Sequence, residues 1–350
     1  MASDTLLVSA VICAYTLERW SDLQQAIRSV QQQTHPPDEL ILVIDHNPQL
    51  LTLAKQTFSG VNVVENQHAR GLSGARNSGI SHTHGRVIAF MDEDAVAAPD
   101  WIERLLSGYH DPNVVGVGGA VRPDWVVTPP NWLPDEFGWV VGCSYKGLPE
   151  IPTPMRNPIG CNMSFLRDAL TASGGFRSGM GRVGRIPLGC EETELSIRIT
   201  HLNPSSVILY QPESVVFHKV PEWRTRWDYF IHRCYAEGLS KALVTQYVGS
   251  IDGLSSERRY ITRTLAQGVF YNLKTAVLHK KPIVVTRSAA IVLGLGVTTL
   301  GYLVGTGTRL IQHKGSSQPR LEQLSQTFLL LNPQRIAHNE DHKLQESKRD

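Results

Sequence analysis

The first 120 residues predict an α/β fold with a doubly wound, mostly parallel sheet. Apolar runs of strand length alternate with stretches of helical periodicity, the order expected of repeated β-α units. The first run, residues 6–14, is apolar at almost every position, as in a strand buried on both faces. Sheets of this kind bind ligands at the carboxyl ends of their strands.

The elements follow one another closely. Residues 20–33 place Leu23, Ala26, Ile27 and Val30 at helical spacing, and residues 40–44 form a second apolar run that ends at Asp45. We therefore expect strands at 6–14, 40–44, 61–64, 87–91 and 114–118, alternating with helices at 20–33, 50–58, 73–81 and 99–106.

The pattern changes between residues 122 and 158, where prolines and tryptophans dominate. These residues are Trp125, Pro129, Pro130, Trp132, Pro134 and Trp139. We expect a long functional loop here, not a new domain. Beyond it we expect regular structure at 162–165, a helix from about 191, short strands at 207–209 and 214–217, and helices at 227–244 and 256–278. The polar tail, 315–350, is expected to be partly disordered.

The composition argues against several classes of protein. With 350 residues, 41% hydrophobic and 19% charged, the chain can bury a full core. A net charge of +2, no long basic block and no zinc-finger spacing argue against nucleic-acid binding. The five cysteines are scattered, odd in number and free of CxxC pairs, as expected of reduced cytosolic thiols. Residues 1–5 carry no basic stretch, so we expect a first strand and no signal peptide.

An uncharged apolar segment, 288–308, lies between Arg287 and Arg309. As a helix it would reach roughly 30 Å, about the thickness of a bilayer core. It also contains five glycines and several threonines. Two interpretations remain open: a membrane-spanning or membrane-embedded helix, or a buried or interfacial one. Lysines at 280, 281 and 314 flank it on both sides and give no orientation.

Three acidic residues, Asp92, Glu93 and Asp94, stand at the carboxyl end of the predicted strand 87–91. The two aspartates are two positions apart. At a frayed strand end, one carboxylate can bind a divalent cation. The other can bind the same cation directly, or contact it through water or a ligand. Oxygen ligands suit Mg²⁺ or Mn²⁺. A solvated acidic turn is the alternative.

Polar and aromatic residues also end the first two predicted strands. Asp45 could accept a hydrogen bond from a nucleotide base or a ribose hydroxyl, or it could cap a helix. Ala14, Tyr15 and Thr16 end the first strand and could pack against the base. Both groups would lie at the same sheet edge as the acidic triplet.

A glycine-containing segment, 71–77, opens the predicted helix 73–81. Gly71 and the glycine that follows permit close approach of the backbone, and a helix N-terminus favours phosphate. Arg76 in this segment could reach a diphosphate or Asp92, or it could be a surface residue.

Together these residues resemble the family 2 glycosyltransferases, which have the GT-A fold. The matching segments are 13–16, 45, 71–77, 92–94, 160–165, 174–176 and 189–195. Each is modest alone, but their order and spacing are specific. The resemblance covers about residues 6–220. It implies a GT-A domain at 1–222, with a nucleotide-binding half (1–120) and an acceptor and catalytic half (121–222). A helical, membrane-associated extension would follow at 223–314.

The resemblance also implies a role for particular residues. In the family the second acid of the pair at 191–192 is the expected catalytic base, which assigns that role to Glu192. The family usually has Glu-Asp here, so Glu191 remains an alternative base. Asp92 and Glu93 would contact the donor.

A histidine near position 218 completes the metal site in several related enzymes. The resemblance therefore implies a metal site of Asp92, Asp94 and His218, unless the histidine is structural. The cofactor would be Mn²⁺ or Mg²⁺. Basic residues that follow would help to hold the diphosphate or form a solvated loop; they are Lys219, Arg224 and Arg226.

The segments 119–125, 132–139, 156–162 and 238–241 resemble a prokaryotic subgroup that includes archaeal glucosyl-dolichyl-phosphate glucuronosyltransferases. This implies inverting transfer from a nucleotide-sugar, a UDP-sugar by default, to a lipid-linked or glycan acceptor. The protein would act at the cytoplasmic face of the cell membrane, anchored by its C-terminal hydrophobic helix. The loop tryptophans would form a sugar-stacking wall or pack the loop.

Two other functions remain open. A nucleotidyltransferase should carry a glycine-rich, basic loop where residues 15–19 contain no glycine. An inactive sugar- or nucleotide-binding subunit of a membrane polysaccharide assembly would usually lack one of the acids. All of them are present in this chain: Asp92, Asp94, Glu191 and Glu192.

Overall fold

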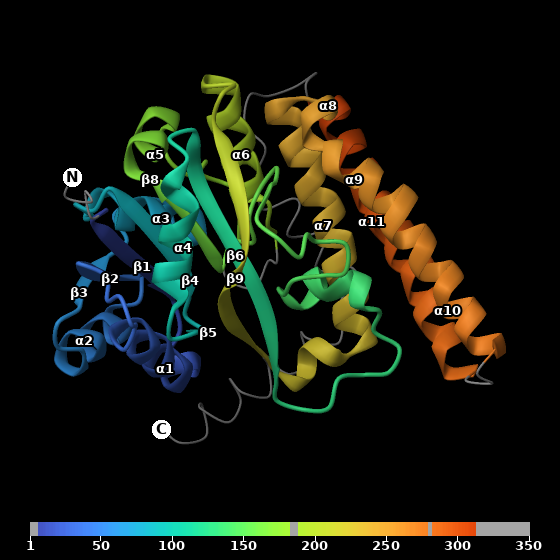
Figure 1. Ribbon diagram of the computed structural model, residues 1–350, viewed down its shortest axis with the longest axis horizontal. Helices are drawn as coiled ribbons and strands as arrows, with labels where there is room; N and C mark the ends of the chain where they lie inside the picture. The colour runs from blue at the N-terminus through green and yellow to red at the C-terminus, as the bar shows by residue number, and fades with distance from the viewer. Residues whose placement is uncertain (1–5, 183–187, 279–281, 313–350) are drawn as a thin grey trace. The chain divides into compact units, whose positions relative to one another are not determined.

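The computed structural model describes residues 6–182, 188–278 and 282–312 (Figure 1). Residues through Thr306 belong to one compact unit. A second unit begins at Gly307, and only its residues 307–312, which are helical, are described. The predicted disorder of 315–350 lies outside the described residues. The predicted boundary between 222 and 223 remains a prediction.

The first half of the sheet is parallel, as predicted. Its strands lie in the order β3-β2-β1-β4 and are β1 Val8–Ala14, β2 Glu39–Ile44, β3 Asn62–Glu65 and β4 Val87–Asp92. The helices of this half, some of them 3-10, are η1 Leu17–Arg19, α1 Trp20–Gln31, α2 Pro48–Thr57, α3 Leu72–Ser81, α4 Trp101–Leu106 and η2 Ser107–His110.

The central strands are buried on both faces, which explains their unbroken apolar sequence. Alternate residues of a strand point to opposite faces. Ile12 of β1 therefore packs with Leu23 of α1 on one side. Its neighbour Val11 packs with Ala75 of α3 and Leu195 on the other. The polar ends of these strands consequently meet at one edge of the sheet.

The second half of the sheet is mixed, because β8 runs antiparallel to both β4 and β6. Strand β9 is parallel to β6 and antiparallel to β5 and β7. The bounds are β5 Ala95–Ala97, β6 Val114–Trp125, β7 Thr153–Pro154, β8 Asn162–Leu166 and β9 Val207–Val220.

Two predictions for this half were wrong. The strand predicted at 114–118 continues to Trp125, because its polar end still pairs with β9 despite Pro123. The two short strands predicted at 207–209 and 214–217 are the single strand β9. A register irregularity between Gly119 and Ala120 accommodates the polar residues that interrupt its apolar pattern.

The remaining helices are mostly C-terminal. They are η3 Asp135–Val141, α5 Arg167–Ser173, α6 Glu191–Leu202, η4 Glu222–Thr225, α7 Trp227–Val248, α8 Ser250–Gly253, α9 Ser255–Arg259, the π-helical η5 Tyr260–Leu265, α10 Ala266–Leu278, η6 Pro282–Val284 and α11 Val285–Gln312. A single apolar cluster joins Phe137 of η3, Val220 of β9, Phe230 of α7 and Ile291 of α11.

Helices α7 and α11 run side by side in close contact (Figure 1). Glycines make the contact possible. A Cβ atom on Gly238 would lie 2.1 Å from the carbonyl oxygen of Thr298, and one on Gly301 would lie 2.3 Å from that of Tyr235. Such small residues let two helix backbones approach directly.

Candidate active site

A cavity of about 1310 Å³ opens at the carboxyl ends of β1, β2 and β4. It extends along the beginning of α6 and reaches α7, α9, η5 and α11. Both predicted acidic clusters line it, as do Cys13, Ala14, Tyr15 and Asp45. Thr16, which was predicted with them, instead accepts a hydrogen bond from the backbone N–H of Glu18 and caps η1.

Asp92, Asp94 and His218 come together as predicted. Their potential ligand atoms lie within 4.8 Å of one another. Asp92 ends β4, and the short strand β5 pairs Ala95 with His218 of β9, which carries the imidazole to the aspartates. Two carboxylates and an imidazole form a donor set that could hold a divalent cation.

Asp94 is surrounded by three basic side chains. His218 lies 3.4 Å from it, and Arg19 and Arg224 lie at 3.0 and 3.3 Å. Burial alone would raise the pKa of Asp94, but the histidine and the two arginines hold that pKa well below its usual range. Asp94 is therefore a permanent carboxylate at neutral pH.

Glu93 contacts the same arginine as Asp94, Arg19. Its carboxylate accepts hydrogen bonds from the backbone N–H of Tyr15, at 3.3 Å, and from Arg19, at 3.1 Å. Burial raises the pKa of Glu93 to about 8, although Arg19 opposes the shift. In this structure Glu93 fixes the end of β1. Its predicted contact with the donor remains a prediction.

Asp45 anchors the opening of α3. It accepts hydrogen bonds from Asn66 at 2.6 Å and from the backbone N–H of Gly71 at 2.9 Å. Gly71 has φ of 125°, a conformation that favours glycine. The alternative that Asp45 caps a helix is wrong, because Asn47 caps α2. Asp45 thus holds the loop in front of the predicted phosphate-binding helix.

Arg76 joins the two acidic clusters. Its guanidinium lies 3.2 Å from Asp92 and 2.7 Å from Glu191, and it donates to the carbonyl of Gly160 at 2.9 Å. The side chain is buried, so the surface alternative is wrong. Residues 92 and 191, which are far apart in sequence, therefore face the same cavity.

The two neighbouring glutamates of α6 have different environments. Glu191 is paired with Arg76, whereas Glu192 accepts a hydrogen bond from the hydroxyl of Thr193 at 3.1 Å and one from its own backbone N–H. Burial and the adjacent Glu191 raise the pKa of Glu192 to about 8. Among the residues that the structure describes, Glu191 has an ion pair and Glu192 has none, and the raised pKa of Glu192 suits proton transfer near neutral pH.

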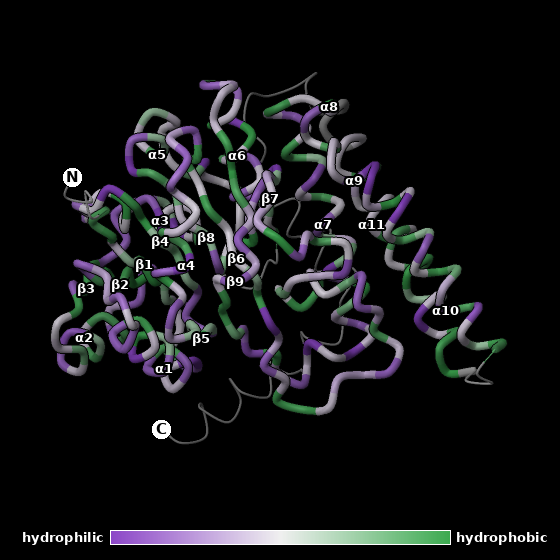
Figure 2. Tube along the Cα trace, in the orientation of Figure 1, coloured by the Kyte–Doolittle hydropathy of each residue, from purple (hydrophilic) through white to green (hydrophobic). Residues whose placement is uncertain are grey.

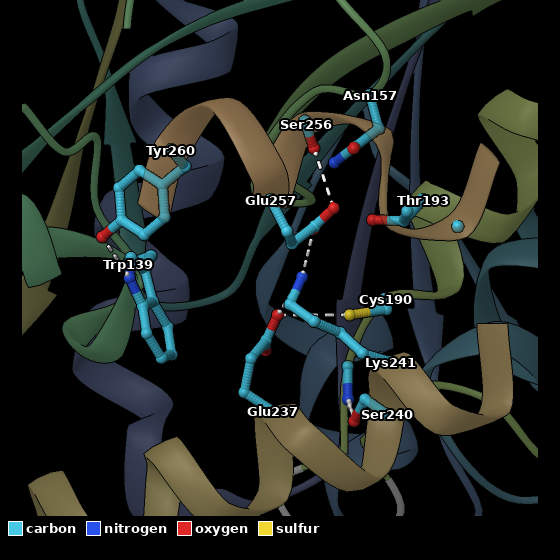
Figure 3. Close-up of polar contacts among 12 residues, drawn as sticks. Trp139, Asn157, Cys190, Thr193, Glu237, Ser240, Lys241, Ser256, Glu257 and Tyr260 are labelled. Atoms are coloured by element: carbon cyan, nitrogen blue, oxygen red, sulfur yellow. Dashed lines mark hydrogen bonds and ion pairs between the residues drawn. The ribbon is translucent and has the colours of Figure 1, made fainter. Parts of the chain in front are cut away.

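Helix α7 supports the beginning of α6 (Figure 3). Ser240 accepts a hydrogen bond from the backbone N–H of Gly189 at 3.0 Å, and Cys190 donates to Glu237 at 3.4 Å. Cys190 has φ of 67°, an uncommon conformation for a residue other than glycine. Lys241 lies between Glu237 and Glu257, at 3.1 and 2.6 Å.

This buried network also fixes α9. Arg156 from the long loop makes two hydrogen bonds to Glu257, at 2.7 and 2.9 Å. Burial would raise the pKa of Glu257, but Lys241 and Arg156 lower it to about 2. Sequence reasoning had only a match at 238–241 as a signal and assigned these residues no role, because the contacts join elements that are distant in sequence.

The long loop contributes mainly packing. Trp132 stacks on Trp227 with 3.9 Å between ring centroids, which supports the packing alternative for this residue. Trp139 lines the cavity and donates a hydrogen bond to Tyr260 at 3.1 Å (Figure 3). Trp125 packs against the same apolar cluster.

Only one of the three basic residues predicted near the diphosphate lies at the acidic cluster. That residue is Arg224. Lys219 pairs with Asp22 at 2.5 Å, and the exposed Arg226 pairs with Asp228 at 3.1 Å. Arg19, which was not predicted, takes a place beside Asp94.

The fold and the cavity define an α/β enzyme with acidic side chains at the strand ends. The chain matches the model of glycosyl transferase family 2 over residues 9–173. It is 37% identical over 241 residues to the glucosyl-dolichyl phosphate glucuronosyltransferase of Haloferax volcanii, covering 68% of this chain and 77% of that one. The chain therefore belongs to glycosyl transferase family 2 and is a glycosyltransferase.

The chain is also similar to a second relative and, in its fold, to a solved structure. The succinoglycan biosynthesis protein ExoM of Rhizobium meliloti is 25% identical over 248 residues, covering 68% of this chain and 75% of that one. The mannosyltransferase PcManGT from Pyrobaculum calidifontis, solved with GDP-Man and Mn²⁺, has a TM-score of 0.52 at 16% identity, covering 85% and 88%. The fold is the GT-A fold with a helical C-terminal region. The nucleotidyltransferase alternative is not supported.

Proposed function

We propose that this enzyme transfers a sugar from a nucleotide-diphosphate sugar to a lipid-linked sugar, with inversion and with a divalent cation. A UDP-sugar is the default donor. The observation that carries the proposal is Arg76, which joins Asp92 to Glu191 within one cavity. A donor at the strand ends and an acceptor beside α6 would thus meet in the same space.

Asp92, Asp94 and His218 would hold the cation beside the donor diphosphate. When bound, the cation would offset the negative charge that builds up on the leaving nucleoside diphosphate. The imidazole favours Mn²⁺ over Mg²⁺, which prefers oxygen ligands alone. Arg19 and Arg224 lie beside Asp94 and would add positive charge to the diphosphate site.

Glu192 would act as the base. It would accept the proton of the acceptor hydroxyl as that oxygen attacks the anomeric carbon from the face opposite the diphosphate. Glu191 would instead keep Arg76 in place, because the two are already paired at 2.7 Å. A single displacement of this kind inverts the anomeric centre.

The acceptor class is supported by two observations. A relative of this chain is named for transfer to a glucosyl-dolichyl phosphate. The cavity also extends to the apolar helix α11, where Leu295 and Tyr302 line it. A lipid-linked acceptor would place the enzyme on a membrane, with the cytoplasmic face as the expected side.

Replacing Glu192 with Gln tests the assignment of the base. We expect transfer to fall by at least about 100-fold, with donor binding retained. Labelled nucleotide-sugars incubated with membranes containing the enzyme would measure transfer, and a panel of them would identify the donor. Glu103→Gln, the same change at an exposed position of α4, is the control and should leave transfer unchanged. Near-normal turnover of Glu192→Gln would refute the assignment.

A further inference from the structure

Helices α10 and α11 form a hairpin with an exposed apolar surface. They contact each other through Ser288, whose hydroxyl donates to the carbonyl of Val269 at 3.2 Å. We define the hairpin face as its exposed large apolar side chains among the described residues: Phe270, Tyr271, Leu273, Val277 and Leu278 of α10, Ile283 of the turn, and Val285, Val292, Leu293, Leu300 and Leu303 of α11. Figure 2 marks both helices as rich in hydrophobic residues.

The positions of the hairpin face follow helical spacing. On α11 the exposed stripe passes through Val285, Val292, Leu300 and Leu303, while Gly294 and Gly301 are buried on the other side. Each helix therefore has one side inside the protein and one side in contact with the surroundings. An apolar surface of this extent marks an interaction site on a protein.

The charge of the same segment indicates the partner. Residues 266–312, from the start of α10 to the end of α11, contain five Lys and Arg residues and no Asp or Glu, although the whole chain has a net charge of only +2. A segment that is apolar on one side, cationic and free of acids is suited to a membrane surface with anionic lipids. A protein partner would be expected to meet mixed charges.

The inner side of α11 argues against a helix that crosses the membrane. By length and composition alone that helix could cross, and 28% of its most apolar window is buried inside the protein. Its inner stripe is fastened to α7 by Gly238 and Gly301. Close to this contact, α7 carries the ion-paired Glu237 and Lys241, which line the cavity. If α11 crossed a bilayer, α7 would bring these charges into hydrocarbon, which is unfavourable.

We propose that the α10–α11 hairpin lies in the plane of a bilayer containing anionic phospholipids, with the hairpin face inserted among the headgroups and upper acyl chains. Arg258, Arg259 and Arg263 line the cavity where it approaches the hairpin. The cavity would therefore open beside the lipid surface. This inference deepens the membrane location in the proposed function, but it is tested by lipid binding, which needs neither donor nor acceptor.

Vesicle flotation tests the partner. The full chain should float with vesicles of neutral phosphatidylcholine mixed with anionic phosphatidylglycerol, and at least tenfold less with neutral vesicles alone. Lys274→Glu on α10 should weaken binding to anionic vesicles, whereas Lys55→Glu, an exposed lysine of α2 with the same charge change, should not. Equal flotation with both vesicle types would overturn the choice of anionic lipid.

A second pair of variants tests the hairpin face. Leu300→Gln with Leu303→Gln should reduce flotation at least tenfold, whereas Leu202→Gln, an equally exposed leucine on α6, should not. Circular dichroism checks that the variants are folded. If vesicle-free protein is a dimer and the double variant converts it to a monomer without changing flotation, a second copy of the chain covers this face and the proposal is wrong.

Labelling with a membrane-impermeant maleimide tests the in-plane orientation. One variant carries Lys274→Cys, in the second half of α10, which leads to the start of α11. Another carries Thr306→Cys, near the other end of α11. An in-plane hairpin gives both positions the same accessibility in inverted membrane vesicles, before and after permeabilisation. Labelling at one end only until the vesicles are permeabilised would establish a crossing helix and overturn the proposal. The wild type, with its five native cysteines, gives the background.

Discussion

At the scale of single residues, one ion pair distinguishes two neighbouring carboxylates of the site. Glu191 and Glu192 are chemically identical neighbours, yet only Glu191 is paired with Arg76. The sequence could not separate them, because the arginine that does so is distant in the chain. Glu191 is thus the counter-ion of Arg76, while burial and Glu191 raise the pKa of Glu192.

The pH dependence of transfer follows from Glu192. Burial and Glu191 raise its pKa to about 8. A base acts as the carboxylate, so the rate should rise with pH and level off above about pH 8. A pH–rate profile from 5.5 to 9 at saturating donor and metal checks this. A flat profile below pH 7 would contradict the assignment.

The metal site can be tested through Asp94. Asp94→Asn removes a carboxylate whose pKa is held low by a histidine and two arginines. We expect the Mn²⁺ concentration for half-maximal activity to rise at least about 100-fold, and EDTA to abolish wild-type activity. Asp168→Asn, the same change at an exposed position of α5 outside the cavity, is the matched control. An unchanged metal requirement in Asp94→Asn would rule out this ligand.

At the scale of elements, sequence patterns predicted strands and helices where apolar periodicity was clear. The run at 6–14 and the helix at 20–33 are present as β1 and α1. The patterns failed at β6 and β9, where polar residues and Pro123 continue within strands because the backbone ladder between the strands persists. Such pairing is a property of two distant segments and leaves no local signal.

The crossing of α7 and α11 should be sensitive to single methyl groups. Gly238→Ala would bring Cβ to 2.1 Å from the carbonyl oxygen of Thr298, so the helices must separate. We expect a loss of about 2 kcal/mol. Gly296→Ala on the same helix pair meets nothing within 4 Å and should be neutral or stabilising by about 0.5–1 kcal/mol. Thermal unfolding in mild detergent measures both, and equal effects would contradict the packing.

Helix α7 should position the beginning of α6, which carries Glu191 and Glu192. Ser240→Ala leaves the backbone N–H of Gly189 without its acceptor, at a cost of about 1 kcal/mol. Since Gly189 lies just before α6, kcat should fall several-fold while the KM for the donor stays unchanged. Ser173→Ala, at the end of α5, is the control. A change in KM with constant kcat would show that Ser240 acts on the donor side.

At the scale of the whole molecule, the C-terminal helices complete the enzyme's core. Ile291 of α11 packs in the same cluster as Phe137 and Phe230. A chain truncated after Gly253 should therefore be insoluble or inactive, in contrast to the full chain. Expression and gel filtration would check this. A soluble, active truncation would mean that the helices are a separable anchor.

The sequence predicted the acidic residues of the cavity but not the residues of α7, α9 and the long loop that surround them. Asp92 and Asp94 follow a buried strand, so their place at the sheet edge could be deduced from the strand alone. Lys241, Glu257 and Arg156 gave no comparable signal, because their roles arise only when α7, α9 and the long loop pack together. Local pattern identifies chemistry at strand ends, and long-range packing decides what surrounds it.

The π-helix η5 connects the residues that line the cavity to the α10–α11 hairpin. Glu257, which is fixed inside the cavity by Arg156 and Lys241, is followed at once by Arg258 and then by η5 and α10. A detergent that binds the hairpin and displaces it would therefore also displace Glu257 and change the cavity. The detergent used for purification would then change the measured turnover while the sheet stays folded. Turnover of this protein should therefore be compared between detergents.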